Sequence, residues 1–280
     1  MRALFVSTKS SVFWATATLL VGSMFAVGMM SSELNQINYK ISETAVYVGS
    51  IWMTLGAYSE LEKRGVNWRG AGVISLGAGL LFALAGYFLI LRNLTTTDIL
   101  SETLEPLRLA INKAFPNGAL EQGVLVKYLP GFFTASLFGS LAVSFAFESK
   151  IARIFKIQRE KVASGLRWLE FRLSDTTIWL SLASLLVLGL NLSLSSSLVP
   201  AATVLKTISI NFLIIAAVAF LFQGLAVIEF MLRFYRLGVF ARTITYLLII
   251  LQLAPFVMVV GFVDYWVDFR KLVRKKIKTT

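Results

Sequence analysis

Two carboxylates four residues apart, Asp264 and Asp268, are the paired acidic side chains that lie next to an apolar run. In a continuous helix they would share one face with Lys271 and Lys275, an arrangement compatible with acid–base chemistry or cation binding. The alternative is a charged helix end that is solvated at a membrane surface. We favour this second interpretation, because nothing else near the pair specifies a reaction.

Three amide side chains inside apolar runs are candidates for contacting a polar solute, namely Asn211, Gln223 and Gln252. Asn211 and Gln223 lie between Lys206 and Glu229, where 22 residues carry no charge. A helix of that length spans a hydrocarbon core of about 30 Å. Since polar groups in a membrane face other helices or a cavity, we expect a central helix with a hydrogen-bond partner for each amide.

Helical spacing predicts two further side-chain contacts. Glu229 and Arg233 are four residues apart in the favourable order for an ion pair. Trp266 and Arg270 have the same spacing, which suits a cation–π pair.

The sequence contains no histidine and no cysteine. This removes the commonest general base, the commonest metal ligand and any thiolate nucleophile. The chain also has no G-x-x-x-x-G-K-[ST] phosphate-binding loop and no G-x-S-x-G nucleophile elbow. We therefore predict that the protein is not an enzyme, with no catalytic residues, no metal site and no cofactor.

Composition places the chain in a membrane. Of its 280 residues, 57% are hydrophobic and only 15% are charged, against about 25% charged in soluble domains. The formal net charge is +12, but the basic residues cluster between the apolar runs. Such clusters set topology and attract anionic lipid. We therefore expect the lipid bilayer with its anionic head groups as partner, other membrane subunits as further candidates, and no nucleic acid.

The apolar runs predict an all-α, polytopic membrane helical bundle with about seven candidate spans, within a range of six to eight. The run at 44–59 is the weakest, because only 16 residues there lack a charge. The run at 70–91 is rich in small residues, which predicts close helix packing. We expect Pro130 in the first turn of the fourth span and Pro255 in the middle of the last. The seven runs are at 10–32, 44–59, 70–91, 128–147, 176–205, 209–236 and 243–263.

Polar segments divide the chain into three parts. Residues 1–92 form a three-span part, 93–127 an extramembrane amphipathic segment, and 128–280 a four-span part with a basic tail. Apolar residues alternate with charges at 101–114 and 148–175, which predicts amphipathic helices on the membrane surface. The segment 60–69 should be a charged turn and the Ser-rich segment 191–200 a loop.

The distribution of basic residues predicts a cytoplasmic N-terminus. With that orientation 15 Lys and Arg fall on the cytoplasmic side and 6 on the other side, before the tail is counted. If all seven runs cross, however, the tail places six more basic residues on the wrong side. Either the tail breaks the positive-inside rule or one run does not cross.

Several short blocks of the second half carry a family resemblance, and the last two are fairly specific in their order and spacing. They are Tyr128-Leu129-Pro130, Leu169-Glu170-Phe171-Arg172-Leu173, Asn211, Phe222-Gln223-Gly224-Leu225-Ala226-Val227-Ile228, and Gly261-Phe262-Val263-Asp264-Tyr265-Trp266-Val267-Asp268-Phe269-Arg270-Lys271.

On these blocks, residues 125–272 resemble the YybS-like family of bacterial membrane proteins of unknown function. The resemblance marks Gln223, Gly224, Asp264, Asp268 and Arg270 as motif residues. This family is distantly similar to the substrate-binding subunits of energy-coupling-factor transporters. The resemblance thus implies a multi-pass protein of the bacterial inner membrane with a solute pocket among its helices.

Two functions follow from these observations. The first is a solute-binding transport subunit that is energised by a separate ATPase, which fits the missing phosphate loop. The second is a non-transporting membrane scaffold whose basic segments dock partners or lipid. A cavity lined by Asn211, Gln223 and Gln252 would favour transport, whereas a solid bundle packed through small residues would favour the scaffold.

Overall fold

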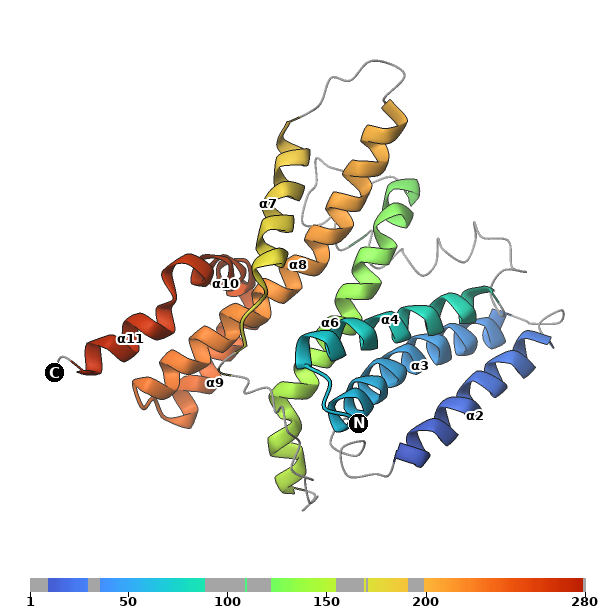
Figure 1. Ribbon diagram of the computed structural model, residues 1–280, viewed down its shortest axis with the longest axis horizontal. Helices are drawn as coiled ribbons and strands as arrows, with labels where there is room; N and C mark the ends of the chain where they lie inside the picture. The colour runs from blue at the N-terminus through green and yellow to red at the C-terminus, as the bar shows by residue number, and fades with distance from the viewer. Residues whose placement is uncertain are drawn as a thin grey trace. The chain divides into compact units, whose positions relative to one another are not determined.

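The computed structural model describes residues 10–29, 36–88, 109, 122–154, 169, 171–190 and 199–278, and the regular elements in these ranges are all helices (Figure 1). This confirms the predicted all-α class. The helices are α2 (Ser10–Met29), α3 (Gln36–Lys63), α4 (Trp68–Gly86), α6 (Gln122–Ile154), α7 (Asp175–Gly189), α8 (Val199–Phe234), α9 (Val239–Leu248), the π-helix η5 (Ile249–Leu253), α10 (Ala254–Val267) and α11 (Phe269–Lys278).

Three of the described helices are long and apolar enough to cross a membrane. They cover Trp68–Gly86, Lys127–Phe145 and Ala201–Phe234. Shorter apolar helices are at Val12–Ser23, Asp175–Gly189 and Ala254–Val267. The long spans with the shorter apolar helices confirm a membrane helical bundle.

The chain forms two compact units, and α6 contributes to both. Unit 1 comprises residues 1–129 and 140–165, and unit 2 comprises residues 130–139 and 166–280. In unit 1 the buried core is formed by Leu55, Tyr58, Ala71 and Leu141. On α4 the buried positions include Ala71, Ser75 and Gly79, at four-residue spacing. The predicted close packing of this run is therefore present on one face of the helix.

The segment 60–69 is not the simple charged turn that its composition suggests. Helix α3 continues to Lys63, and a turn through Gly65, with φ of 76°, leads to α4 at Trp68. Glu60 and Glu62 are buried, with 5% and 2% of their surface exposed. Glu62 follows the buried Tyr58 by four residues and therefore lies on the same face of α3. Glu60 lies on a different face and accepts the Arg64 Nε–H at 3.1 Å.

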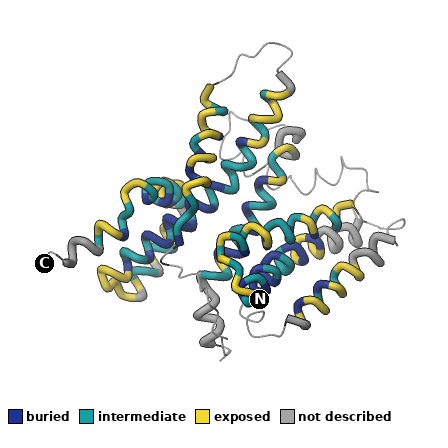
Figure 2. Tube along the Cα trace, viewed as in Figure 1, coloured by how far each residue is buried: buried dark blue, intermediate teal, exposed yellow. Residues whose placement is uncertain are grey.

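In unit 2, α7 packs along α8 through a cluster formed by Ile178, Ala216 and Phe220. Helix α8 has 36 residues and is about 54 Å long. It begins at Val199, well before the predicted start at 209. The polar residues between these two positions are too few among apolar residues to end the helix. Buried residues follow each other closely along its middle (Figure 2).

The two expected proline positions are both wrong, for different reasons. Pro130 lies inside α6, which begins at Gln122, eight residues earlier. Pro255 lies in the first turn of α10, directly after the π-helix η5. A first-turn proline leaves no intrahelical donor missing, and the π-helix provides the transition into that turn.

Several sequence predictions fall outside the described residues. They are the surface helix at 101–114 apart from Leu109, the segment 155–168 of the predicted amphipathic region, and the loop at 191–198. Residues 148–154 continue α6 as helix.

Candidate functional site: a polar network at the end of α10

Helices α8 and α10 approach each other at two glycines. A Cβ atom on Gly224 would lie only 2.8 Å from Cγ1 and 2.9 Å from the carbonyl carbon of Val257. A Cβ atom on Gly261 would lie 2.7 Å from the Gly224 nitrogen and 2.9 Å from the Phe220 carbonyl carbon. At each glycine the added Cβ atom would overlap backbone atoms of the facing helix, so neither helix can move aside cheaply. This close approach brings the next turn of α10 against Gln223.

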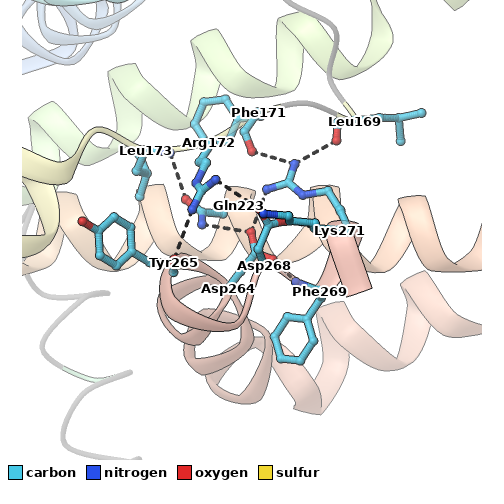
Figure 3. A network of polar contacts seen from close by, with 11 residues as sticks. Leu169, Phe171, Arg172, Leu173, Gln223, Asp264, Tyr265, Asp268, Phe269 and Lys271 are labelled. Atoms are coloured by element: carbon cyan, nitrogen blue, oxygen red, sulfur yellow. Dashed lines mark hydrogen bonds and ion pairs between the residues drawn. The ribbon is translucent and has the colours of Figure 1, made fainter. Parts of the chain in front are cut away.

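Gln223 is completely buried, and both ends of its amide have protein partners (Figure 3). Its Oε1 accepts the Leu173 backbone N–H at 2.9 Å, just before α7 begins. Its Nε2 donates to Asp264 Oδ2 at 3.2 Å, near the end of α10. The side chain thus connects the middle of α8 to two other helices, as buried polar groups must be paired.

Asp264 and Arg270 form a buried ion pair. Arg270 Nη2 donates to Asp264 Oδ2 at 2.7 Å. The side chain of Arg270 is 9% exposed and that of Asp264 is 1% exposed. Arg270 Nη1 also donates to the carbonyl oxygens of Leu169 at 2.8 Å and Phe171 at 3.1 Å. The interpretation of Asp264 as a solvated helix end is therefore wrong, because its carboxylate is buried together with the guanidinium of Arg270.

Asp268 ends α10 and begins α11. Its φ of 46° is left-handed, so the predicted single helical face through Asp264, Asp268 and the lysines does not exist. Asp268 Oδ1 accepts the Lys271 backbone N–H at 3.2 Å, as an N-cap residue does. Asp268 Oδ2 pairs with Arg172 Nη1 at 3.4 Å, and Arg172 Nη2 donates to the Tyr265 carbonyl at 3.1 Å. We call Arg172, Gln223, Asp264, Asp268 and Arg270 the polar network.

The left-handed turn also changes the role expected for Trp266. The ring of Trp266 contacts Phe262 and Tyr265 edge-on, while Arg270 is held by Asp264. The predicted cation–π pair of Trp266 with Arg270 is therefore wrong. A cation–π contact is present instead between Arg172 and Tyr265, with the Arg172 Cζ atom 5.9 Å from the ring centroid. Helical spacing failed here because the helix ends between the two residues.

Asn211 connects α8 to α6 within unit 2. Its Oδ1 accepts the Gly131 backbone N–H at 2.6 Å, and its Nδ2 donates to the Thr207 carbonyl at 2.9 Å. Gly131 follows the helix-interior Pro130, whose ring disturbs the local backbone ladder. A Cβ atom on Gly131 would lie 2.9 Å from Asn211 Cα. The prediction of a protein partner for each amide is thus confirmed.

At the end of α8, the predicted pair of Glu229 and Arg233 is present at 2.6 Å. Tyr246 donates its hydroxyl to the other oxygen of the Glu229 carboxylate, also at 2.6 Å. This second bond ties α8 to α9. No local sequence pattern predicts this bond, because Tyr246 is 17 residues away and lies beyond a turn.

The structure brings some predicted site residues together and leaves others apart. Gln223, Asp264, Asp268 and Arg270 lie in the polar network, and Gly224 lies directly beside it. Asn211 is 12 residues away along α8, about 18 Å. Gln252 is exposed on η5. Arg172 lies in one of the blocks that carry the family resemblance, and no local sequence pattern predicts its contacts with Asp268 and Tyr265.

The network has limited chemical capability. Its carboxylates are engaged by guanidinium groups and backbone N–H groups. Within the residues described by the structure, no three acidic side chains gather to hold a metal ion. The arrangement fixes the ends of α7, α10 and α11 against the middle of α8.

Comparison with curated proteins and with solved structures gave no match. A family model, described as predicted membrane protein (DUF2232), matches residues 13–265. The matched range includes Arg172, Gln223 and Asp264 and ends just before Asp268. Because it covers most of the sequence, the chain belongs to this family of predicted membrane proteins.

Proposed function

We propose that this protein is a non-transporting membrane scaffold, in which buried polar residues hold the helices together and the basic segments contact lipid or partner proteins. The observation that carries the proposal is the state of Gln223. It is fully buried, and the two ends of its amide are bonded to Leu173 and Asp264. The amide of Asn211 is likewise bonded at both ends.

A solute that used these amides would have to displace existing hydrogen bonds. Freeing the Leu173 N–H from Gln223 without replacing the bond costs about 1–3 kcal/mol. Separating Asp264 from Arg270 costs more, because each would be left as a buried unpaired charge. The third candidate, Gln252, is exposed on a different element. The backbone contacts at Gly224 and Gly261 are those of a packed bundle.

The alternative is a solute-binding transport subunit energised by a separate ATPase. The buried Asp264–Arg270 pair favours it, because ionisable residues inside membrane proteins often mark paths for ions or solutes. The YybS-like blocks and their distant similarity to subunits of energy-coupling-factor transporters point the same way. In this alternative the network would have to open to admit the solute.

Thermal unfolding in a mild detergent distinguishes the two functions. A solute present at 100 times its Kd stabilises the folded protein by about 2.7 kcal/mol, which is readily seen as a higher Tm. The probes are a panel of vitamins and divalent metal ions, since these are the solutes the resemblance implies. The scaffold predicts an unchanged Tm throughout the panel. A probe that raises the Tm of the parent and of Gln252→Leu, but not of Asn211→Leu, would contradict it.

A further inference from the structure

The polar network joins two basic parts of the chain that are far apart in sequence. Arg270, at the start of α11, donates to the carbonyl oxygens of Leu169 and Phe171, which precede α7. In return Arg172 pairs with Asp268 and bonds to the Tyr265 carbonyl at the end of α10. Figure 3 shows Phe171, Arg172 and Asp268 meeting in one place. The entry into α7 and the exit from α10 therefore lie side by side.

This meeting point has the exposure expected at a membrane surface. The side chains of Arg172 and Asp268 are 43% and 32% exposed, and Lys271 is exposed. Charged groups with that exposure belong in the head-group region rather than in hydrocarbon. The chain leaves this surface at Asp175 and returns to it at Val267, so it crosses the membrane an even number of times in between. The basic tail then lies on the same face as Arg172, which stands at the end of the basic segment.

Helix α11 has the composition of a helix that lies on a membrane. Its ten residues include six basic and no acidic ones. At 100° per residue, its four apolar residues fall within an arc of about 140°. One of them, Leu272, is 54% exposed, so the described residues of unit 2 leave the apolar side open there. The four are Phe269, Leu272, Val273 and Ile277.

The network also fixes the start of α11. Asp264 Oδ1 accepts the Phe269 backbone N–H at 3.1 Å, and Asp268 Oδ1 accepts that of Lys271. These carboxylates satisfy donors of the first turn, which have no intrahelical partner. The direction in which α11 leaves α10 is therefore set by the carboxylates of Asp264 and Asp268. Because these bonds fix its first turn, α11 does not need to undergo a disorder-to-order transition before its apolar side contacts lipid.

We propose that α11 is an interfacial helix that binds the anionic lipid leaflet on the face of the basic segment 148–175. The inference rests on the scaffold function and names its partner. Charge complementarity selects anionic lipid, because a helix with six cations and no anions is attracted to a negative surface. The exposed Leu272 supplies the apolar contact that such a helix inserts below the head groups.

Fluorescence of a single cysteine tests this proposal directly, since the chain has no cysteine of its own. Leu272→Cys is labelled with an environment-sensitive dye, and the full chain is placed in nanodiscs of phosphatidylglycerol or of phosphatidylcholine. The emission should move to shorter wavelength in phosphatidylglycerol only. Replacing Lys271, Arg274 and Lys275 together by Gln should abolish that shift. Gly238→Cys, in the α8–α9 connection, is the matched control and should not respond to lipid charge.

Two results would overturn the proposal. A water-like emission in both lipids would mean that α11 does not bind the leaflet. A buried-type emission in both lipids would mean that the surroundings of Leu272 do not depend on anionic lipid. Either result leaves the scaffold function in place. Conversely, solute-dependent stabilisation in the unfolding experiment would remove the scaffold function whatever the dye reports.

Discussion

At the scale of single residues, the amide side chains decide between the two functions. Gln223 and Asn211 were candidates for a solute site because polar groups are rare and costly inside a membrane. The structure uses both to satisfy backbone N–H groups, at Leu173 and at Gly131. The first bond joins α8 to the segment that precedes α7, and the second joins α8 to α6. Their removal should therefore be seen first in stability.

Gln223→Leu should lower the free energy of unfolding by about 1–3 kcal/mol, because the buried Leu173 N–H loses its acceptor. The change is measured by thermal or denaturant unfolding in a mild detergent. Gln252→Leu is the control, since that side chain is exposed. Equal stabilities for the parent and Gln223→Leu would show that the bond to Leu173 is not structural.

Asn211→Leu should cost about 1 kcal/mol, in line with measured hydrogen bonds between membrane helices. The loss comes from the Gly131 N–H, which follows Pro130 in α6. The same unfolding assay applies. Gln252→Leu is again the control, because that side chain is exposed. Equal losses for the two variants would argue against the Gly131 bond as the cause.

At the scale of the elements, close backbone contact holds α10 to α8. Gly224 is the position on α8 where α10, the helix that carries Pro255, comes near. The structure puts the contact at Val257, two residues beyond the proline. It also adds Gly261, which contacts the backbone of Phe220.

Gly224→Ala should destabilise the protein markedly, because even one added carbon overlaps the backbone of Val257. Gly238→Ala is matched to it, since a Cβ atom there meets nothing within 4 Å. Unfolding in detergent should separate the two variants by more than about 1 kcal/mol, the lower bound for overpacking. A Gly224→Ala protein as stable as Gly238→Ala would refute the close approach.

Apolar periodicity predicted most helices but not their ends. A pattern of hydrophobic residues cannot predict the left-handed turn at Asp268. The turn depends on the backbone conformation of a single polar residue, one of the few types that adopt it. As a result Asp264, Asp268 and Lys271 were assigned to one face. The partners of Gln223 were equally hidden, since Leu173 and Asp264 are 50 and 41 residues away. Such pairs depend on tertiary packing that no local pattern encodes.

At the scale of the whole molecule, composition alone was enough for the membrane class and the helical fold. The division into parts at 92 and 127 followed charge along the chain. Compactness instead groups residues 130–139 of α6 with the second half and returns residues 140–165 to the first. The helix α6 therefore belongs partly to each unit. A division into consecutive segments cannot assign one helix to two units.

The shared surface of the basic segment and the tail yields a prediction about topology. A cysteine at Ser164 and, in a separate variant, one at Lys271 should both resist an impermeant thiol reagent in intact cells. Both should react once the cells are opened, because segments rich in Lys and Arg stay in the cytoplasm. Protection of one with labelling of the other would place the two segments on opposite faces.

The central claim is that the buried polar residues of unit 2 hold its helices together, and a double-mutant cycle on Asp264 and Arg270 tests it most directly. Asp264→Leu or Arg270→Met alone leaves a buried unpaired charge and should cost about 3–5 kcal/mol of unfolding free energy in detergent. The double variant removes both charges and should be more stable than either single variant. Additive losses, or single variants as stable as the parent, would contradict the account.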